Sequence, residues 1–202
     1  MNKGLLYVIT APSGCGKGTV LAKLMEKHPE LAMSVSATTR APRPGEIDGV
    51  HYYYISKEEF EQKIQNGEML EYVQYVGNYY GTPKAPVEEK TAAGQDILLE
   101  IEVIGGKNIK RLMPNAVLIF IAPPSLGELR ARLEGRGTET QEVIEQRLKT
   151  AQKELTEYTA FDYVVVNDTV DNCVNQIEAI IAATKNSTQN MKQFMEKVIE
   201  QC

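Results

Sequence analysis

The sequence predicts an α/β fold, with a parallel sheet flanked by helices and a small mixed β lobe inserted between core strands. Three observations support this prediction. Short apolar runs alternate with helical patterns, which is typical of parallel sheets. A glycine-rich turn follows the first apolar run, and a tyrosine-rich segment interrupts the alternation between positions 40 and 82. The 202 residues are enough for one domain with such an insertion.

Composition narrows the class of protein. Apolar residues make up 43% of the chain and charged residues 24%, which is ordinary for a globular protein. The net charge of −5 argues against a dedicated nucleic-acid binder. No apolar run approaches the ~20 residues that cross a bilayer, and no signal peptide opens the chain. The three cysteines lack metal-ligand spacing, so we expect reduced thiols in a cytoplasmic protein.

The core elements follow from apolar periodicity. The predicted strands are Leu5–Thr10, Leu31–Ser36, Ile97–Glu102, Ala116–Ala122 and Tyr163–Val166. The predicted helices are Thr19–Lys27, Ala85–Ala93, Ile104–Leu112, Ser125–Leu133 and Gln141–Tyr158. Capping boxes at Ser56–Glu59 and Ser125–Glu128 mark two helix starts.

Two segments stand apart from this alternation. Tyrosines are concentrated between Arg40 and Thr82, and Asp48-Gly49 and Gly77-Asn78 are turn signals in this segment. The segment is therefore predicted to form a small mixed β lobe, and most of its tyrosines are expected on the half-buried faces of that lobe. After position 186, Met191, Phe194, Met195 and Val198 recur at helical spacing. They predict an amphipathic terminal helix that packs on the core or on a partner.

The turn after the first strand has the pattern of a phosphate-binding loop (P-loop). It reads Ala11-Pro12-Ser13-Gly14-Cys15-Gly16-Lys17-Gly18-Thr19 and leads into a helical stretch. Glycines let backbone N–H groups converge on an anion, and the helix start adds its positive end. Ala11 replaces the first glycine of the pattern, and Gly18 replaces the usual hydroxyl residue, so the hydroxyl moves to Thr19. The alternative is an ordinary glycine-rich turn.

Arginine-bearing loops offer partners for further phosphates. Arg40 and Arg43 lie in a proline-stiffened loop and suit bidentate binding of a phosphate, or else form a solvated basic loop. Arg136 lies between two glycines in Leu133-Glu134-Gly135-Arg136-Gly137-Thr138-Glu139-Thr140. A glycine-hinged loop that carries an arginine is suited to be a lid that closes on phosphates. Arg132 and Arg147 lie on the flanking helical patterns, where arginines are also common as surface charges.

Together these motifs resemble the guanylate kinase family. The P-loop, Ser-Val-Ser-Ala-Thr-Thr-Arg-Ala-Pro-Arg, Gly-Asn-Tyr-Tyr-Gly-Thr, Ile-Ala-Pro-Pro-Ser, Leu-Glu-Gly-Arg-Gly-Thr-Glu-Thr and Val-Val-Asn-Asp occur in the order and spacing of that family, from about Leu5 to Ala182. The resemblance implies a single domain over residues 1–202. Its parts are a P-loop NTPase core (1–36, 83–130 and 158–184), a GMP-binding lobe (37–82), a lid (131–157) and a terminal helix (187–202).

The resemblance also implies roles for individual residues. Lys17, Arg40, Arg136 and Arg147 would be catalytic. ATP would be bound by the P-loop residues Ala11, Pro12, Ser13, Gly14, Cys15, Gly16, Lys17, Gly18 and Thr19 with Arg132, Arg136, Asn167 and Asp168. GMP would be bound by Ser36, Arg40, Arg43, Tyr52, Glu71, Tyr80, Thr82 and Glu102. Mg²⁺ would be held by Thr19 and Glu100, through water.

One departure from the family concerns the strand Ile97–Glu102. The family often has Asp-x-Asp there, whereas this chain has Glu100 and Glu102, each one methylene longer. Carboxylates suit guanine, because guanine presents N1–H and N2–H₂ donors and an ionised carboxylate only accepts. Adenine would leave such a carboxylate unpaired, at a cost of about 1–3 kcal/mol per group.

We therefore expect Mg²⁺-dependent transfer of the ATP γ-phosphoryl group to GMP, without nucleic-acid or membrane partners, by a monomer or homodimer. The acceptor is already anionic, so positioning and charge neutralisation suffice. Two alternatives remain: a related kinase with another acceptor, such as AMP or a ribose bisphosphate, and a phosphopeptide-binding module without catalysis. We also expect the thiol of Cys15, near a helix start, to have a lowered pKa.

Overall fold

A five-stranded sheet forms the core of the computed structural model, which describes residues 3–75, 77–135, 137 and 140–201. Its strand order is β2-β7-β1-β8-β9, and every neighbouring pair is parallel. The strands are β1 (Leu6–Thr10), β2 (Ala32–Met33), β7 (Ile97–Glu100), β8 (Val117–Ala122) and β9 (Tyr163–Val166). The predicted α/β class with a parallel sheet is confirmed.

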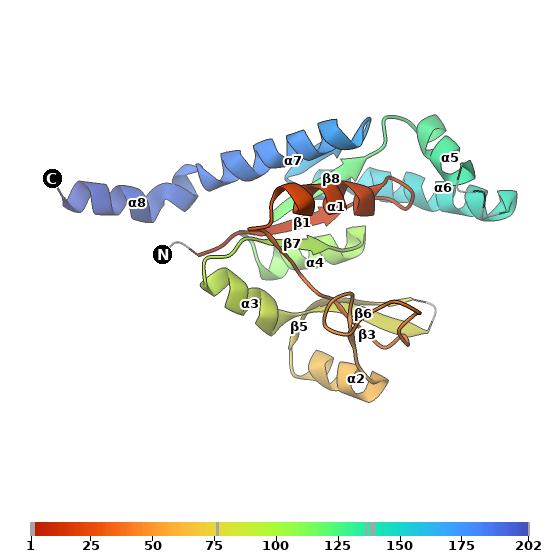
Figure 1. Ribbon diagram of the computed structural model, residues 1–202, viewed down its shortest axis with the longest axis horizontal. Coiled ribbons are helices and arrows are strands. Elements are labelled where there is room, and N and C mark those ends of the chain that lie inside the picture. The colour runs from red at the N-terminus through yellow and green to blue at the C-terminus, as the bar shows by residue number, and fades with distance from the viewer. Residues whose placement is uncertain (1–2, 76, 136, 138–139, 202) are drawn as a thin grey trace.

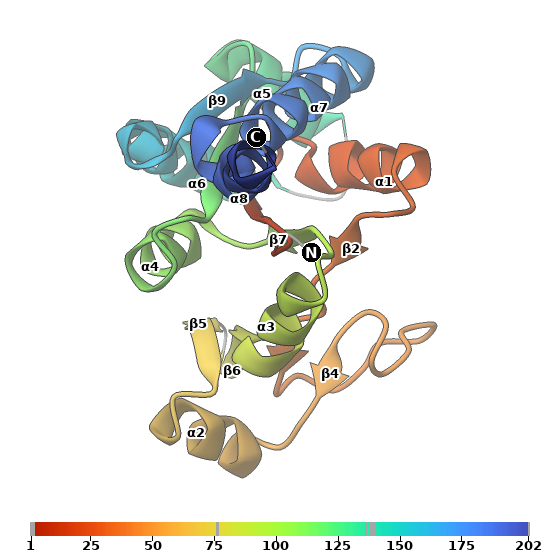
Figure 2. The ribbon, with the colours of Figure 1, turned by 90° about the vertical axis from the view of Figure 1, so that its left-hand side faces the viewer.

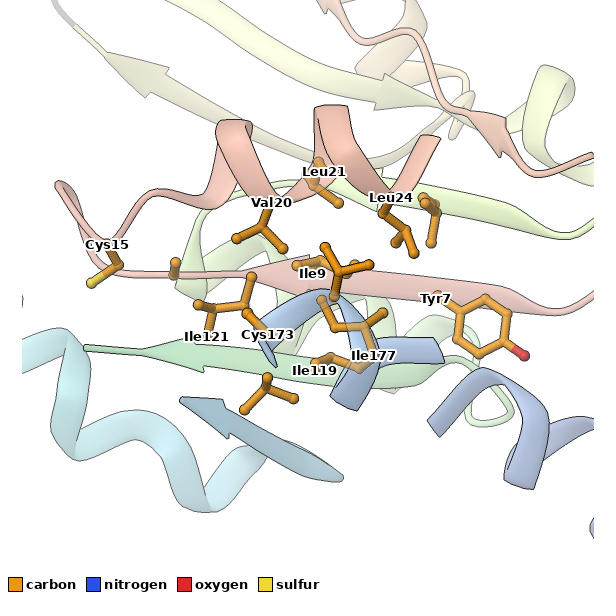
Figure 3. Close-up of a cluster of buried hydrophobic side chains, with 14 of the residues drawn as sticks. Tyr7, Ile9, Cys15, Val20, Leu21, Leu24, Ile119, Ile121, Cys173 and Ile177 are labelled. Carbon is orange, nitrogen blue, oxygen red and sulfur yellow. The ribbon is translucent and has the colours of Figure 1, made fainter. Parts of the chain in front are cut away.

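Helices cover both faces of this sheet (Figures 1 and 2). Successive side chains of β1 point to opposite faces, so they pack against different helices. Tyr7 and Ile9 point to one face and pack with α1 (Lys17–Lys27) and α7 (Val170–Lys185). Figure 3 shows this cluster, with Ile177 of α7 among its members. Leu6 and Val8 point to the other face, beneath α3 (Lys84–Ala92) and α4 (Val103–Leu112). A strand covered on both faces is apolar at every position, as Leu6–Thr10 nearly is.

A second sheet lies below the core in Figure 1 and forms the mixed lobe that the tyrosine-rich segment predicts. Its order is β4-β3-β6-β5, with β3 and β4 parallel and the other pairs antiparallel. The strands are β3 (Ala37–Thr38), β4 (Tyr53–Tyr54), β5 (Met69–Tyr75) and β6 (Asn78–Pro83). Helix α2 (Lys57–Gln65) packs on the lobe through Phe60, and the Ser56 hydroxyl accepts from the Glu59 N–H at 3.1 Å.

Two helices lie beside the end of β1 at which the P-loop begins (Figure 1). Helix α5 (Leu126–Glu134) starts where the capping box predicts, because the Ser125 hydroxyl accepts from the Glu128 N–H at 3.0 Å. Helix α6 (Gln141–Leu155) is shorter than predicted. It passes into a 3₁₀ turn, Thr156–Ala160, before β9.

Other predicted boundaries differ from the structure for identifiable reasons. The strand expected over Leu31–Ser36 is only the two residues of β2, because β2 pairs with β7 alone and the chain then leaves for the lobe. The strand expected over Ile97–Glu102 ends at Glu100, and Glu102 becomes the N-cap of α4. Helix α7 was not predicted, and Thr169 caps its start by accepting from the Asn172 N–H.

The terminal helix α8 (Thr188–Glu200) forms as its periodicity predicts, but it extends past the end of α7 (Figure 1). None of its described residues is buried, and Phe194 and Ile199 are 51% and 68% exposed. The Gln189 amide donates to the Asn115 side chain at 3.0 Å. Of the two expected arrangements, packing of this helix on the core is therefore not what the structure shows, and packing on a partner stays a prediction.

The prediction of a lowered pKa for Cys15 is also wrong. Its side chain belongs to the cluster in Figure 3 and is only 1% exposed. Burial raises the pKa of the Cys15 thiol to about 12, although Arg132 and Lys17 oppose this shift. Among the described cysteines, Cys173 is buried as well, and neither it nor Cys15 is in a disulfide.

The packing predicts a large difference between two isoleucines that both lie on helices. Ile177→Ala empties a fully buried position between α7 and β1, so the free energy of unfolding should fall by about 2–5 kcal/mol. Ile199→Ala, on the exposed face of α8, should change it by less than about 0.5 kcal/mol. Denaturant unfolding of both variants measures the difference, and equal effects would contradict the assigned core.

The raised pKa of Cys15 predicts slow alkylation. With a pKa of about 12, about one thiol in ten thousand is ionised at pH 8, and only the thiolate reacts. Iodoacetamide at pH 8 should therefore leave Cys15 unmodified in the folded protein and modify it in guanidinium chloride. Peptide mass spectrometry would follow the residue directly. Equal modification in both conditions would show that the thiol is accessible.

Candidate active site

The P-loop runs from the end of β1 to the start of α1 and depends on two glycines with left-handed backbone. Gly14 has a φ of 92° and Gly16 a φ of 80°, which L-residues with a side chain rarely adopt. Gly16 is also the N-cap of α1, so the loop ends on the positive end of that helix. With Ala11 and Gly18 in place of the usual residues, the chain still turns from the end of β1 into α1 within six residues.

Lys17, the first residue of α1, extends toward the end of β7. Its Nζ donates to the carbonyl oxygen of Ile101 at 3.1 Å and lies 3.8 Å from Glu100 Oε1. The ammonium group is largely shielded, with 15% of the side chain exposed. The cation is thus held at the carboxyl edge of the sheet, where ligands of parallel α/β sheets bind.

Residues from three other segments converge on the P-loop. The Asn167 amide, directly after β9, donates to the Cys15 carbonyl at 2.7 Å. Arg132 of α5 donates to the Asn167 carbonyl at 2.9 Å. Arg147 of α6 donates to the Ser13 hydroxyl at 2.7 Å. The structure therefore brings these three sequence-predicted residues together around the loop.

Asp168 and Arg136 are the other two residues predicted on the ATP side. Asp168 accepts from the Thr169 N–H and from the Asn172 amide, so its carboxylate closes the turn before α7. These hydrogen bonds, that of Thr169 first, lower the pKa of Asp168. Arg136 lies outside the described residues.

In the lobe, an ion pair holds Arg40. Its guanidinium donates to Glu46 Oε1 at 2.9 Å and lies over the rings of Tyr52 and Tyr54. Glu46 Oε2 accepts from the Arg43 N–H at 2.7 Å and from the Tyr54 hydroxyl at 2.8 Å. The hydrogen bond from Arg40, followed by that from Arg43, lowers the pKa of Glu46 to about 2. The Glu46 carboxylate thus occupies an anion site made by the loop itself.

This anion site is the part that sequence reasoning missed. Glu46 lies in the arginine loop, six residues after Arg40, but a contact across an irregular loop has no periodic signal. The only available signal was a carboxylate close in sequence to two arginines. Arg43 itself is exposed, and its backbone N–H donates the hydrogen bond to Glu46.

Glu71 of β5 is a buried carboxylate with one neutral partner. It is 7% exposed, and its Oε1 accepts from the Thr82 hydroxyl of β6 at 2.8 Å. Burial raises the pKa of Glu71, hydrogen bonds from Thr82 oppose the shift, and the charge of Glu102 adds to it. An ionised carboxylate in such surroundings gains from an incoming ligand that donates hydrogen bonds.

Three of the residues predicted to bind GMP lie on one face of the lobe sheet, since Glu71 of β5 lies opposite Thr82 of β6. Tyr80 and Thr82 are two residues apart on β6 and so point to the same side. Tyr80 packs edge-on against Tyr52, with ring centroids 6.1 Å apart. Ser36, immediately before β3, is half-buried, and its carbonyl accepts from the Tyr53 N–H. Among the described residues, none makes a hydrogen bond with the Ser36 side chain.

The donor set near the P-loop fits a magnesium ion that is brought by a nucleotide. Mg²⁺ commonly takes one or two carboxylates together with substrate phosphates and waters, rather than a cage of protein ligands. Glu100, 41% exposed beside Lys17, supplies a carboxylate, and Thr19 supplies an exposed hydroxyl on the first turn of α1. Within the described ranges, no group of three or more His, Cys, Asp and Glu residues forms a metal site.

The chain is similar in sequence to known guanylate kinases. The guanylate kinase family model matches residues 3–184. Guanylate kinase from Oceanobacillus iheyensis is 50% identical over 199 residues, which is 98% of this chain and 97% of that protein. Guanylate kinase from Synechococcus sp. is 53% identical over 171 residues, 85% of this chain and 90% of that protein.

A solved structure gives the same result. The crystal structure of guanylate kinase from Anaplasma phagocytophilum is 35% identical and superposes with a TM-score of 0.74, covering 93% of this chain and 89% of that one. The sequence match and the structural match both span most of the chain. The chain belongs to the guanylate kinase family.

Proposed function

We propose that this chain is an ATP:GMP phosphotransferase, which moves the γ-phosphoryl group of ATP to GMP and gives ADP and GDP. One observation carries the proposal: Lys17 of the P-loop donates to the Ile101 carbonyl, just after β7, and Glu71 of the lobe lies against Gly105 in the first turn of α4, the helix that begins at Val103. The charge of Glu102, at the start of α4, raises the pKa of Glu71 in the lobe. Two nucleotides bound at Lys17 and at Glu71 would meet between β7 and α4.

On the core side, the backbone of residues 11–19 binds the ATP phosphates, and Lys17 moves from the Ile101 carbonyl to the β- and γ-phosphates. Arg147, which donates to Ser13 of the loop, and Arg132, which donates to the Asn167 carbonyl, supply further positive charge. Asn167 fixes the loop through the Cys15 carbonyl, and Asp168 lies in the adjoining turn beside the adenine. Arg136 is proposed to complete the lid.

On the lobe side, Arg40 and Arg43 bind the GMP phosphate with Tyr52 and Tyr80. The phosphate takes the place of the Glu46 carboxylate at Arg40, so one anion is exchanged for another. Glu71 and Glu102 accept from guanine N1–H and N2–H₂, while Thr82 and Ser36 lie near O6. The hydrogen bond from Thr82 holds the Glu71 carboxylate before the base arrives.

Phosphoryl transfer itself needs no general base, because the attacking oxygen belongs to an anionic phosphate. The protein aligns the two phosphates and surrounds them with the cations of Lys17, Arg40 and Arg147. Mg²⁺, held by Thr19 and Glu100 through water, would neutralise charge on the phosphates.

We propose a cytoplasmic monomer or homodimer that acts without nucleic acid. In the part of the chain that the structure describes, no helix has the length and apolarity to cross a membrane.

The test of this function is an ADP-release assay with ATP, Mg²⁺ and each of GMP, AMP, UMP and CMP. The wild-type protein should turn over GMP alone, and Lys17→Ala should lower turnover at least about a hundredfold while GMP still binds. Lys23→Ala, on the same helix but paired with Asp171, is the matched control and should retain turnover. GMP binding without turnover would favour a phosphopeptide-binding module, and another preferred acceptor would refute the guanine assignment.

Glu71 should control both base choice and pH dependence. Glu71→Gln places an amide donor near the guanine donors, so kcat/KM for GMP should fall about 10- to 100-fold. Because the folded pKa of Glu71 is raised, the wild-type carboxylate is protonated at a higher pH than an ordinary glutamate. The wild-type KM for GMP should therefore rise as the pH falls toward that pKa, and the Glu71→Gln KM should not. Glu196→Gln, on exposed α8, serves as the control, and identical pH profiles for the wild type and Glu71→Gln would refute the role.

A further inference from the structure

Helix α4 has two adjacent glycines as its third and fourth residues, and both are buried. Gly105 and Gly106 lie in its first turn, although glycine is the least favourable residue in a helix interior after proline. Neither residue is among the glycines with positive φ, so backbone conformation does not require them. The space available to a side chain differs between the two.

At Gly105 a side chain would meet Glu71. A Cβ atom there would lie 2.8 Å from Glu71 Oε2 and 3.3 Å from Glu71 Cδ. The carboxylate has little freedom to move, because Glu71 is 7% exposed and its other oxygen accepts from Thr82. A methyl group at position 105 therefore displaces the Glu71 carboxylate or breaks its bond to Thr82.

At Gly106 a side chain would meet only the core. A Cβ atom there would lie 3.1 Å from Thr10 Cγ2 and 3.3 Å from Phe161 Cε1. These are a methyl group and a ring edge, which need to give way by a few tenths of an ångström. Gly105 and Gly106 thus share a helix, a turn and burial, but only Gly105 touches the lobe carboxylate.

The contact at Gly105 also has an electrostatic consequence. The first turn of α4 is the positive end of the helix dipole, and the Glu71 carboxylate lies against it. This position favours the ionised carboxylate, against the burial and the Glu102 charge that favour the neutral form. The same helix start carries Glu102 as its N-cap, so one turn of backbone locates both carboxylates.

We propose that Gly105 is a positioning residue for guanine recognition: the absence of a side chain lets the Glu71 carboxylate lie against the first turn of α4, in the place from which it reads the base. This inference rests on the proposed function, since it assigns guanine to Glu71. It adds a residue that does not itself touch the substrate and that acts through Glu71.

The test compares Gly105→Ala with its neighbour Gly106→Ala. Both gain the same helix propensity, so a general effect on α4 appears in both. Gly105→Ala should raise KM for GMP at least about tenfold, with KM for ATP within about twofold of the wild type. Gly106→Ala should leave KM for GMP within about twofold. Thermal melting of both variants identifies any loss of folding.

A second readout does not depend on the folded fraction. The ratio of kcat/KM for GMP to that for inosine monophosphate, which lacks the 2-amino group, is measured on one enzyme sample. In Gly105→Ala this ratio should fall at least about fivefold, because the displaced carboxylate no longer accepts from that amino group. An unchanged ratio, or equal effects of the two variants, would overturn the role of Gly105 while the wild type still phosphorylates GMP. A wild type that does not phosphorylate GMP would instead overturn the proposed function.

Discussion

The structure depends on a strand that is covered on both faces. Because helices pack on either side of β1, its alternating side chains belong to two separate hydrophobic clusters. The strand β1 ends at the carboxyl edge of the sheet, and there the chain turns through the P-loop into α1. Lys17, Asn167 and Arg147 come from α1, the end of β9 and α6, and they meet because all three segments lie at this edge. The proposed ATP site is therefore a consequence of how β1 is buried.

The lobe has a different physical basis, since polar contacts organise it. Its own apolar cluster is small, with Ala37, Phe60 and Met69 as the buried members. In the loop that holds the two arginines, Arg40 and Tyr54 both donate hydrogen bonds to the Glu46 carboxylate. Glu71 and Thr82 form a second set on the neighbouring strands. A lobe of this kind can offer charged groups to a ligand because they are already paired with one another in the free protein.

Periodicity predicted the elements that are buried or capped in a standard way. The segments that form β1, β8 and β9 are continuous apolar runs. The capping boxes at Ser56 and Ser125 predict the starts of α2 and α5. Helix α7 was missed although its buried residues Val174, Ile177 and Ile181 recur at helical spacing; its cap, Thr169, has no acidic residue three positions later to complete a capping box. The fate of the apolar face of α8 was not predictable, because amphipathicity indicates a helix and does not say what covers it. Glu46 and Gly105 were missed because each acts through one contact between distant elements or across a loop.

The isolation of α8 has a consequence for how the sequence can change. The family match ends at residue 184, one residue before α7 ends, and no described residue of α8 is buried. Substitutions on an exposed helix that contributes little to the core cost little stability. Mutation can therefore alter the apolar face of α8 independently of the residues around the P-loop and the lobe. This segment can acquire or lose a role in the cell while the phosphate-binding machinery is preserved.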